Sequence, residues 1–160
     1  MTTARDVTAA IAKEGKYLTF ALGREEYGLE ILSVREIIGL MDITGVPQVP
    51  KYVKGVINLR GKVIPVIDLR LKFGMPSVDY TSETCIIVLN IQNVLMGILV
   101  DRVREVLDIA EADIEPPPTF GSTAGVEFIK GMGKISGKVK ILLNIEKVLT
   151  NDLTIAIKVA

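Results

Sequence analysis

Residues 53–73 read VKGVINLRGKVIPVIDLRLKF, and residues 129–149 read IKGMGKISGKVKILLNIEKVL. Both stretches have a Lys-Gly step near the start, a central Gly-Lys-Val and an apolar run after it. In the first stretch, Arg60-Gly61-Lys62 separates two short apolar runs, as in a hairpin turn. This stretch therefore predicts strands over 56–59 and 63–68, followed by a short helix over 69–73 that ends before Gly74 and Pro76.

A second pair of segments repeats in the same order. Residues 17–38 read YLTFALGREEYGLEILSVREII, and residues 86–107 read IIVLNIQNVLMGILVDRVREVL, at an offset of 69 (86 − 17). The offset of the first pair is 76 (129 − 53), so the second half has gained 7 residues (76 − 69) within 108–128. Because that insertion contains Pro116, Pro117 and Pro118, it is predicted to be a surface loop. Two ordered blocks with matched glycines indicate an internal duplication.

The duplication predicts an all-β fold made of two similar subdomains. We expect an N-terminal extension over 1–15, subdomains over 16–80 and 84–150, and a C-terminal tail over 151–160 without an assigned structure. Each half reads as about five short strands with few helices, which is typical of a small curled sheet or barrel. Residues 34–38 fit a strand or a helix, since both periods match so short a run. Two such units would bury their open edges and apolar faces.

Composition excludes several classes of function. The 160 residues include 19 Lys plus Arg and 19 Asp plus Glu, so a duplex-binding surface is not expected. Aromatic residues make up 5% and Trp is absent, which leaves few platforms for base stacking. The chain has no His and a single cysteine, Cys85, within an apolar run. We therefore expect no nucleic-acid partner, no metal, no cofactor and no catalytic residues. Paired acids such as Asp101 and Glu105 are not expected to form an acid–base couple.

The predicted cell compartment is the cytoplasm. Residues 1–15 carry charges and lack the continuous apolar core of a secretion signal. The longest nearly apolar stretch, 94–100, is far too short to cross a membrane. No direct insertion into a membrane is expected.

Three features have both a structural and a functional interpretation. Arg60 is either a solvated turn residue, the reading that spacing alone favours, or a fixed bidentate donor for a partner's carboxylate or carbonyl. Glu36 follows Arg35, and the pair returns as Arg104 and Glu105, which describes a solvated face or a recognition surface. A further set of apolar residues belongs to the core or lines a groove between the subdomains that could take a partner helix. That set contains Ile31, Ile37, Leu99, Val100 and Val103.

These motifs resemble the CheW family of chemotaxis coupling proteins. The resemblance rests above all on Lys54-Gly-Val-Ile-Asn-Leu-Arg-Gly61 and Ile64-Pro-Val-Ile-Asp-Leu-Arg70. Supporting stretches are 26–29 and 34–37 in the first half and 88–90, 96–101 and 103 in the second. The resemblance covers residues 16–150, nearly the whole chain.

The resemblance implies two five-stranded SH3-like barrels packed together, with a few short helices. It implies an adaptor without enzymatic activity that joins the cytoplasmic signalling tips of chemoreceptors to the regulatory domain of a histidine kinase. It also implies a place at the membrane-associated receptor array, reached through these partners. Carried over by position, the receptor-side residues are Val34, Glu36, Gly55, Asn58 and Arg60. The second half has Lys134 and Ser136 where the first has Asn58 and Arg60, an asymmetry that the family shares.

Overall fold

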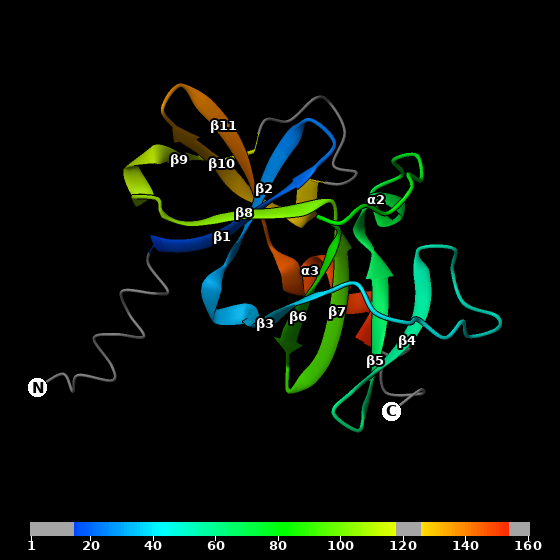
Figure 1. Cartoon of the computed structure of the whole chain (residues 1–160). Helices are drawn as coiled ribbons and strands as arrows, with labels where there is room; N and C mark the ends of the chain where they lie inside the picture. Colours follow the sequence, from blue (N-terminus) through cyan, green and yellow to red (C-terminus); the bar gives the residue numbers. More distant parts are fainter. Residues whose placement is uncertain (1–14, 118–125, 154–160) are drawn as a thin grey trace, which may run out of the picture. The chain divides into compact units, whose positions relative to one another are not determined.

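The computed structural model describes residues 15–117 and 126–153. The sequence predictions for 1–14, for 118–125 within the insertion and for 154–160 of the tail lie outside these residues. The elements of the first half are β1 (Lys16–Leu22), β2 (Glu25–Glu30), η1 (Ile31–Ser33), β3 (Val34–Gly39), β4 (Val53–Leu59), β5 (Lys62–Asp68) and α2 (Leu69–Lys72). Those of the second half are β6 (Cys85–Ile91), β7 (Val94–Val100), β8 (Arg102–Asp108), η2 (Glu111–Asp113), β9 (Ile114–Glu115), η3 (Val126–Phe128), β10 (Ile129–Ile135), β11 (Lys138–Leu143), α3 (Ile145–Leu149) and η4 (Thr150–Asp152) (Figure 1).

The strands form two sheets, each drawn from both halves of the chain. One sheet has the order β8-β1-β2-β11-β10-β9, and the other has the order β3-β6-β7-β5-β4. By the repeat offsets, hairpin β6–β7 is the copy of hairpin β1–β2, while β8, β10 and β11 are the copies of β3, β4 and β5. The six-stranded sheet therefore combines hairpin β1–β2 with four strands of the second half, and the five-stranded sheet combines hairpin β6–β7 with three strands of the first half. The two hairpins have been exchanged between the repeats.

The matched glycines mark the places where the exchanged hairpins join their new sheets. Gly28 of β2 lies opposite Leu142 in the parallel ladder with β11, and Gly97 of β7 lies opposite Val66 in the parallel ladder with β5. A Cβ at Gly28 would lie 2.9 Å from a methyl carbon of Leu142. At Gly97 it would lie 2.8 Å from a methyl carbon of Ile86. Glycine thus leaves room for the neighbouring side chains at equivalent positions.

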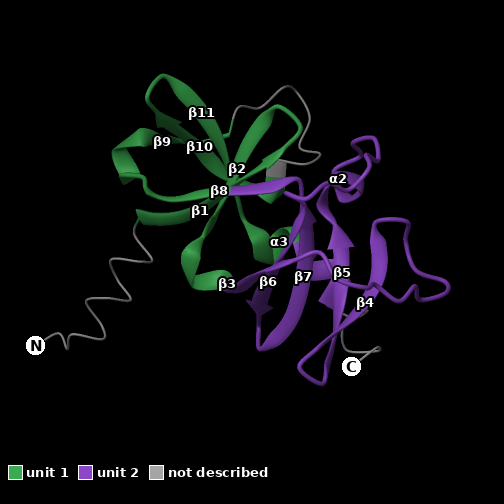
Figure 2. Ribbon diagram, in the orientation of Figure 1, with its two compact units in different colours: residues 1–33, 104–148 green, residues 34–103, 149–160 purple. Residues whose placement is uncertain are grey.

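Two compact units follow the sheets and not the sequence halves. Unit 1 combines the described residues of Met1–Ser33 with those of Arg104–Val148, and unit 2 combines Val34–Val103 with those of Leu149–Ala160 (Figure 2). In unit 1, Tyr17, Ile109 and Leu142 form a buried cluster. In unit 2, the buried cluster contains Ile57, Ile64, Val66, Ile86, Val88 and Leu99. The halves 16–80 and 84–150 describe the repeat in the sequence, whereas the units describe packing.

Both sheets are curled like an open barrel. In neither does a continuous ladder of backbone pairing among the described strands close the barrel. In unit 2, a single antiparallel bridge joins Thr44, which follows β3, to Val56 of the other edge strand β4. In unit 1 the equivalent pairing is made by β9, whose Glu115 lies opposite Met132 of β10. The prediction of an all-β fold with few short helices is confirmed, with sheets of five and six strands. Residues 34–38 are a strand, and the predicted loop of the insertion is wrong at 114–115, because Ile114 packs against the unit 1 core.

Candidate interaction surface

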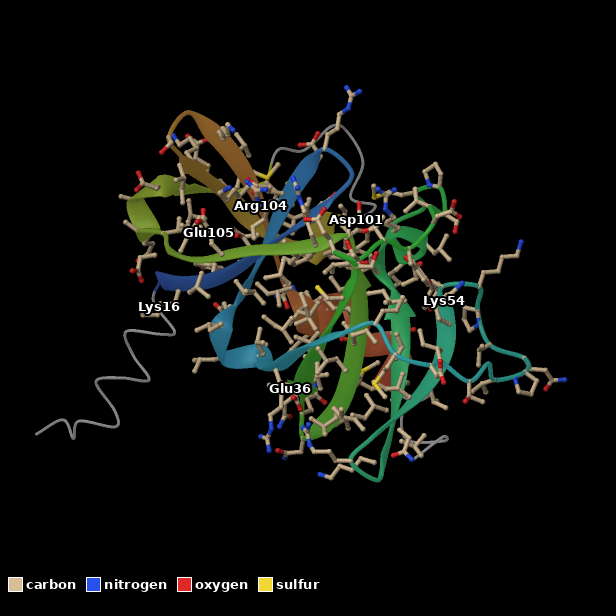
Figure 3. The ribbon with its side chains drawn as sticks, in the orientation of Figure 1. Lys16, Glu36, Lys54, Asp101, Arg104 and Glu105 are labelled. Carbon is tan, nitrogen blue, oxygen red and sulfur yellow. The ribbon has the colours of Figure 1, made fainter. Side chains whose placement is uncertain are left out.

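An ion pair joins β3 to the turn between β4 and β5. Arg60 donates from Nη2 to Oε1 of Glu36, and the Arg60 side chain remains 70% exposed while that of Glu36 is 29% exposed. Figure 3 shows Glu36 on β3 and Lys54 on β4. A guanidinium has five N–H donors in a planar fork, so pairing with one carboxylate leaves capacity for a partner's acceptor. The structure thus brings together two of the five residues that the resemblance implied.

The turn that carries Arg60 has a backbone conformation that long side chains rarely adopt. Leu59 and Lys62 are opposite one another in the β4–β5 ladder, so Arg60 and Gly61 are the two turn residues. Their φ angles are 51° and 87°. Positive φ at both positions defines the type I′ turn, whose twist matches the twist of the flanking strands. The predicted hairpin turn is present, with an exposed arginine at its tip.

Asn58 lies beside this turn and is also exposed, but its side-chain oxygen already accepts a hydrogen bond. Asn58 Oδ1 accepts a hydrogen bond of 2.9 Å from the backbone N–H of Gly61. Asn90 Oδ1 accepts a hydrogen bond of 3.0 Å from the N–H of Asn93 in the hairpin between β6 and β7. The two asparagines have the same role, which is to cap a hairpin turn from the strand before it.

Gly55 is buried, and the backbone of another segment occupies the space that a side chain would need. Its φ is +142°, and an added Cβ would lie 2.0 Å from the carbonyl oxygen of Thr44. Thr44 and Val56 exchange two backbone hydrogen bonds of 2.8 Å each. Gly131, the copy of Gly55, leaves similar room beside Glu115 of β9. Gly55 is therefore the residue that lets the segment after β3 pair with β4.

The remaining predicted residues differ in exposure. Val34 is half-buried at the start of β3, opposite Leu89. Of the five residues predicted to line a groove, Leu99 and Val100 are each only 2% exposed, and Leu99 belongs to the unit 2 core. Ile37 is exposed, and Ile31 and Val103 are half-buried. The groove stays a prediction.

Sequence reasoning missed a polar network around α2. The guanidinium of Arg70 donates two hydrogen bonds to Asp101, of 2.7 Å from Nε and 2.6 Å from Nη2. Asp152, which is 1% exposed, accepts from Lys72 Nζ at 3.0 Å and from the Tyr52 hydroxyl at 2.7 Å. Burial raises the pKa of Tyr52, and the hydrogen bond to Asp152 adds to this effect. Alternation of Asp68, Arg70 and Lys72 was the only available signal, because the partners are far away in the sequence.

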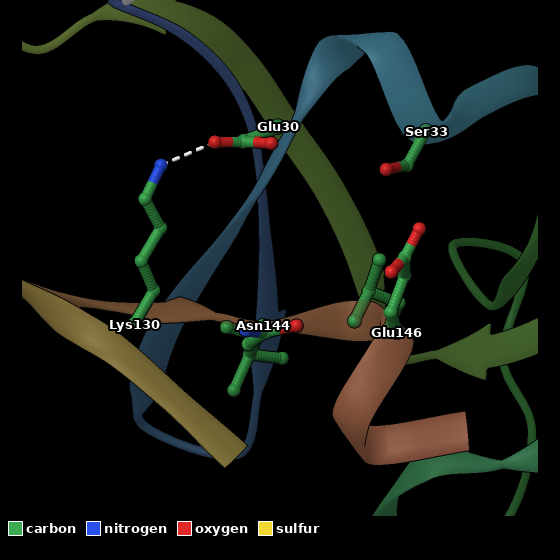
Figure 4. A pocket seen from close by; sticks show the side chains of 7 residues that line it. Glu30, Ser33, Lys130, Asn144 and Glu146 are labelled. Atoms are coloured by element: carbon green, nitrogen blue, oxygen red, sulfur yellow. Dashed lines mark hydrogen bonds and ion pairs between the residues drawn. The ribbon is translucent and has the colours of Figure 1, made fainter. Parts of the chain in front are cut away.

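Unit 1 contains a pocket of about 310 Å³ lined by Glu30, Ser33, Lys130, Leu143, Asn144, Ile145 and Glu146 (Figure 4). Lys130 pairs with Glu30 across one wall and also donates 2.8 Å to the hydroxyl of Tyr17. Among these described lining residues there is neither histidine nor cysteine. The pocket therefore offers neither a cysteine nucleophile nor a histidine base.

A family model described as the CheW-like domain matches residues 16–153. The chain belongs to the CheW-like family. A chemotaxis protein CheW of Klebsiella aerogenes is 42% identical over 137 residues, which cover 86% of this chain and 82% of that protein. One of Helicobacter pylori is 36% identical over 138 residues, covering 86% and 82%. A crystal structure of the scaffolding protein TtCheW from Thermoanaerobacter tengcongensis has a TM-score of 0.78 and 38% identity, and covers 85% of this chain and 92% of that one.

Membership of the family establishes the part of the function that these relatives share. The sequence relatives are chemotaxis proteins, and the solved structure is that of a scaffolding protein. The prediction of a chemotaxis adaptor is confirmed: this CheW-like protein acts in chemotaxis as a scaffold. Within the described residues, no helix is long and apolar enough to span a bilayer.

Proposed function

We propose that this CheW-like protein couples chemoreceptors to a histidine kinase by binding the receptors' cytoplasmic signalling tips and the kinase's regulatory domain. It carries out no reaction of its own. It works in the cytoplasm and reaches the membrane-associated array only through these partners. The family supports the adaptor role, and the structure supports a binding surface where β3 meets the β4–β5 turn.

The observation that carries the proposed receptor side is the exposed Arg60 guanidinium beside Glu36. Glu36 has a copy in the second half, Glu105, but Arg60 is replaced there by Ser136. The ion pair is therefore specific to the first half, although the fold of the hairpin is common to both. Arginine is enriched among residues that dominate binding energy, because its planar fork makes several directed hydrogen bonds.

The proposal is tested by titrating the protein with two probes, a receptor signalling-tip fragment and a kinase regulatory domain from the same genome. Arg60→Ala is expected to weaken receptor binding about tenfold or more, since charge-assisted hydrogen bonds contribute roughly 1.5–3 kcal/mol. The free energy of unfolding should change by less than about 1 kcal/mol, because the pair with Glu36 is exposed. Calorimetry and thermal melting measure the two effects.

Arg24 provides a matched control. It is an exposed arginine in the two-residue turn between β1 and β2, so Arg24→Ala removes the same kind of group from another hairpin. Receptor affinity should remain at the wild-type value in this variant. Failure to bind either probe at low and moderate salt would overturn the proposed function. Unchanged receptor binding in Arg60→Ala would remove Arg60 from the receptor side.

A further inference from the structure

We infer that Asn58 is a positioning residue, whose side chain fixes the turn that presents Arg60 and does not itself contact the receptor. This inference rests on the proposed function, because it concerns how the proposed receptor-binding arginine is held. Its position in the family motif alone implied that Asn58 contacts the receptor directly. The contacts of its side chain assign it a different role.

The hydrogen bond of Asn58 acts on the peptide unit next to Arg60. The N–H that Asn58 Oδ1 accepts belongs to Gly61, so it lies in the peptide that joins Arg60 to Gly61. Holding this peptide restricts the backbone torsion of Arg60 itself. The head of the same arginine is held from β3 by Glu36. Arg60 is therefore restrained at its backbone by one residue and at its guanidinium by another.

The second half of the chain shows that the turn can form without the asparagine. Ser136 and Gly137, the copies of Arg60 and Gly61, have φ angles of 52° and 77°. Lys134 takes the place of Asn58, and an ammonium group has no acceptor for a backbone N–H. Lys134 donates instead to Glu115 at 2.7 Å. Between the two copies of this hairpin, the cap is present beside the arginine and absent beside the serine, so the hairpin itself does not require it.

The positive φ of Arg60 explains why the hydrogen bond to Asn58 is useful in this turn. Gly, Asn and Asp are the residues that normally occupy this position of a type I′ turn, and a long side chain there is strained. Backbone strain of this kind persists where surrounding contacts hold it, and it is concentrated at functional sites. Asn58 supplies such a contact, so removing its acceptor should let Arg60 sample orientations that do not bind.

The experiment titrates the full chain with the same receptor signalling-tip fragment. Asn58→Ala is expected to lower affinity about fivefold, since one neutral hydrogen bond is lost. Asn58→Asp keeps the acceptor and should bind as the wild type does. Asn90→Ala removes the matching cap from the β6–β7 hairpin and should leave affinity unchanged. In the Arg60→Ala background, Asn58→Ala should cause no further loss, because a positioning residue has nothing left to position.

Three results would overturn the inference while the proposed function stands. One is an equal loss in Asn58→Asp and Asn58→Ala, which would mean that the side-chain NH₂ contacts the receptor. Another is a full additional loss from Asn58→Ala when Arg60 is already alanine. If Arg60→Ala alone binds normally, the proposed role of Arg60 fails first. Wild-type affinity in Asn58→Ala beside a weakened Arg60→Ala overturns only the positioning role.

Discussion

At the scale of single residues, Gly55 makes room for the two edge regions of the five-stranded sheet to pair. Its positive φ and the nearby oxygen of Thr44 leave no room for a methyl group. Gly55→Ala should therefore lower the free energy of unfolding by roughly 2 kcal/mol or more, from strained backbone and a displaced Thr44–Val56 bridge. Chemical denaturation measures the change.

Gly45 is the control for this substitution. It follows Thr44 directly, and an added Cβ there would meet nothing within 4 Å. Gly45→Ala should therefore be nearly neutral. Equal stability of the two alanine variants would show that the close approach at Gly55 is not needed by the fold.

The same residues show what a sequence motif can and cannot tell. Asn-Leu-Arg-Gly predicted a hairpin turn with an exposed arginine, and both are present. The motif placed Gly55, Asn58 and Arg60 together as receptor determinants, although one is buried against Thr44 and another caps the turn. Motif matching cannot distinguish a residue that contacts the partner from one that holds the contacting residue in place, because both kinds occupy fixed positions in the motif. The distinction depends on tertiary contacts and backbone torsions.

At the scale of elements, α2 is held by partly buried charges. Arg70 and Asp101 have side chains that are 13% and 26% exposed and make two hydrogen bonds. We expect Arg70→Ala to cost about 2 kcal/mol of unfolding free energy, because Asp101 loses a bidentate partner. Lys16→Ala, which removes the exposed pair with Asp108, should cost less than about 0.5 kcal/mol. Denaturant titration of both variants tests the contrast, and similar costs would contradict it.

Three strands of unit 1 meet at Glu26 of β2. Its carboxylate accepts hydrogen bonds from Lys140 of β11 and Arg104 of β8. The bond from Lys140 is the main cause that lowers the pKa of Glu26 below its ordinary value of 4.5, against the opposing effect of burial. As the pH falls below 4.5, the unfolded chain takes up this proton before the folded chain does. The resulting stability is present above 4.5 and is lost as the pH falls through the lowered pKa.

Glu26→Gln tests this pH dependence. The variant should be less stable than the wild type near neutral pH, and the difference should shrink as acid is added below pH 4.5. Urea titrations at several pH values give the unfolding free energies. A constant difference at every pH would assign the effect of the substitution to packing and not to charge.

At the scale of the whole molecule, strand exchange makes the two halves of the sequence depend on each other. Strands β3 and β5 need β6 and β7 as neighbours, and β1 and β2 need β8 and β11. A chain cut between residues 82 and 83 should therefore give two fragments that lack cooperative unfolding when alone. Mixed together, they should recover strand content by circular dichroism. A cooperative transition in either fragment by itself would contradict this dependence.

Short apolar runs between turn residues predicted most strands, and repeated blocks with matched glycines predicted the duplication, but neither predicted the exchange. Residues 17–22 and 86–91 are nearly continuous apolar runs, which is typical of buried strands, and this pattern is the same whichever sheet receives them. Choice of neighbour depends on how the connecting segments run and on local fit, as at Gly28, where an added Cβ would meet Leu142 of β11. Strand β9 was missed because two residues beside three prolines carry no measurable period.

The order of strands has a consequence for synthesis on the ribosome. All strands of the five-stranded sheet lie within Val34–Val100, so this sheet can assemble as one continuous stretch of nascent chain. Hairpin β1–β2 is translated before it, yet its neighbours β8 and β11 are translated afterwards. At ordinary elongation rates, the gap between β2 and β11 lasts on the order of ten seconds. Of the strands in these two sheets, those of hairpin β1–β2 therefore wait longest during synthesis for the neighbours that cover their apolar side chains.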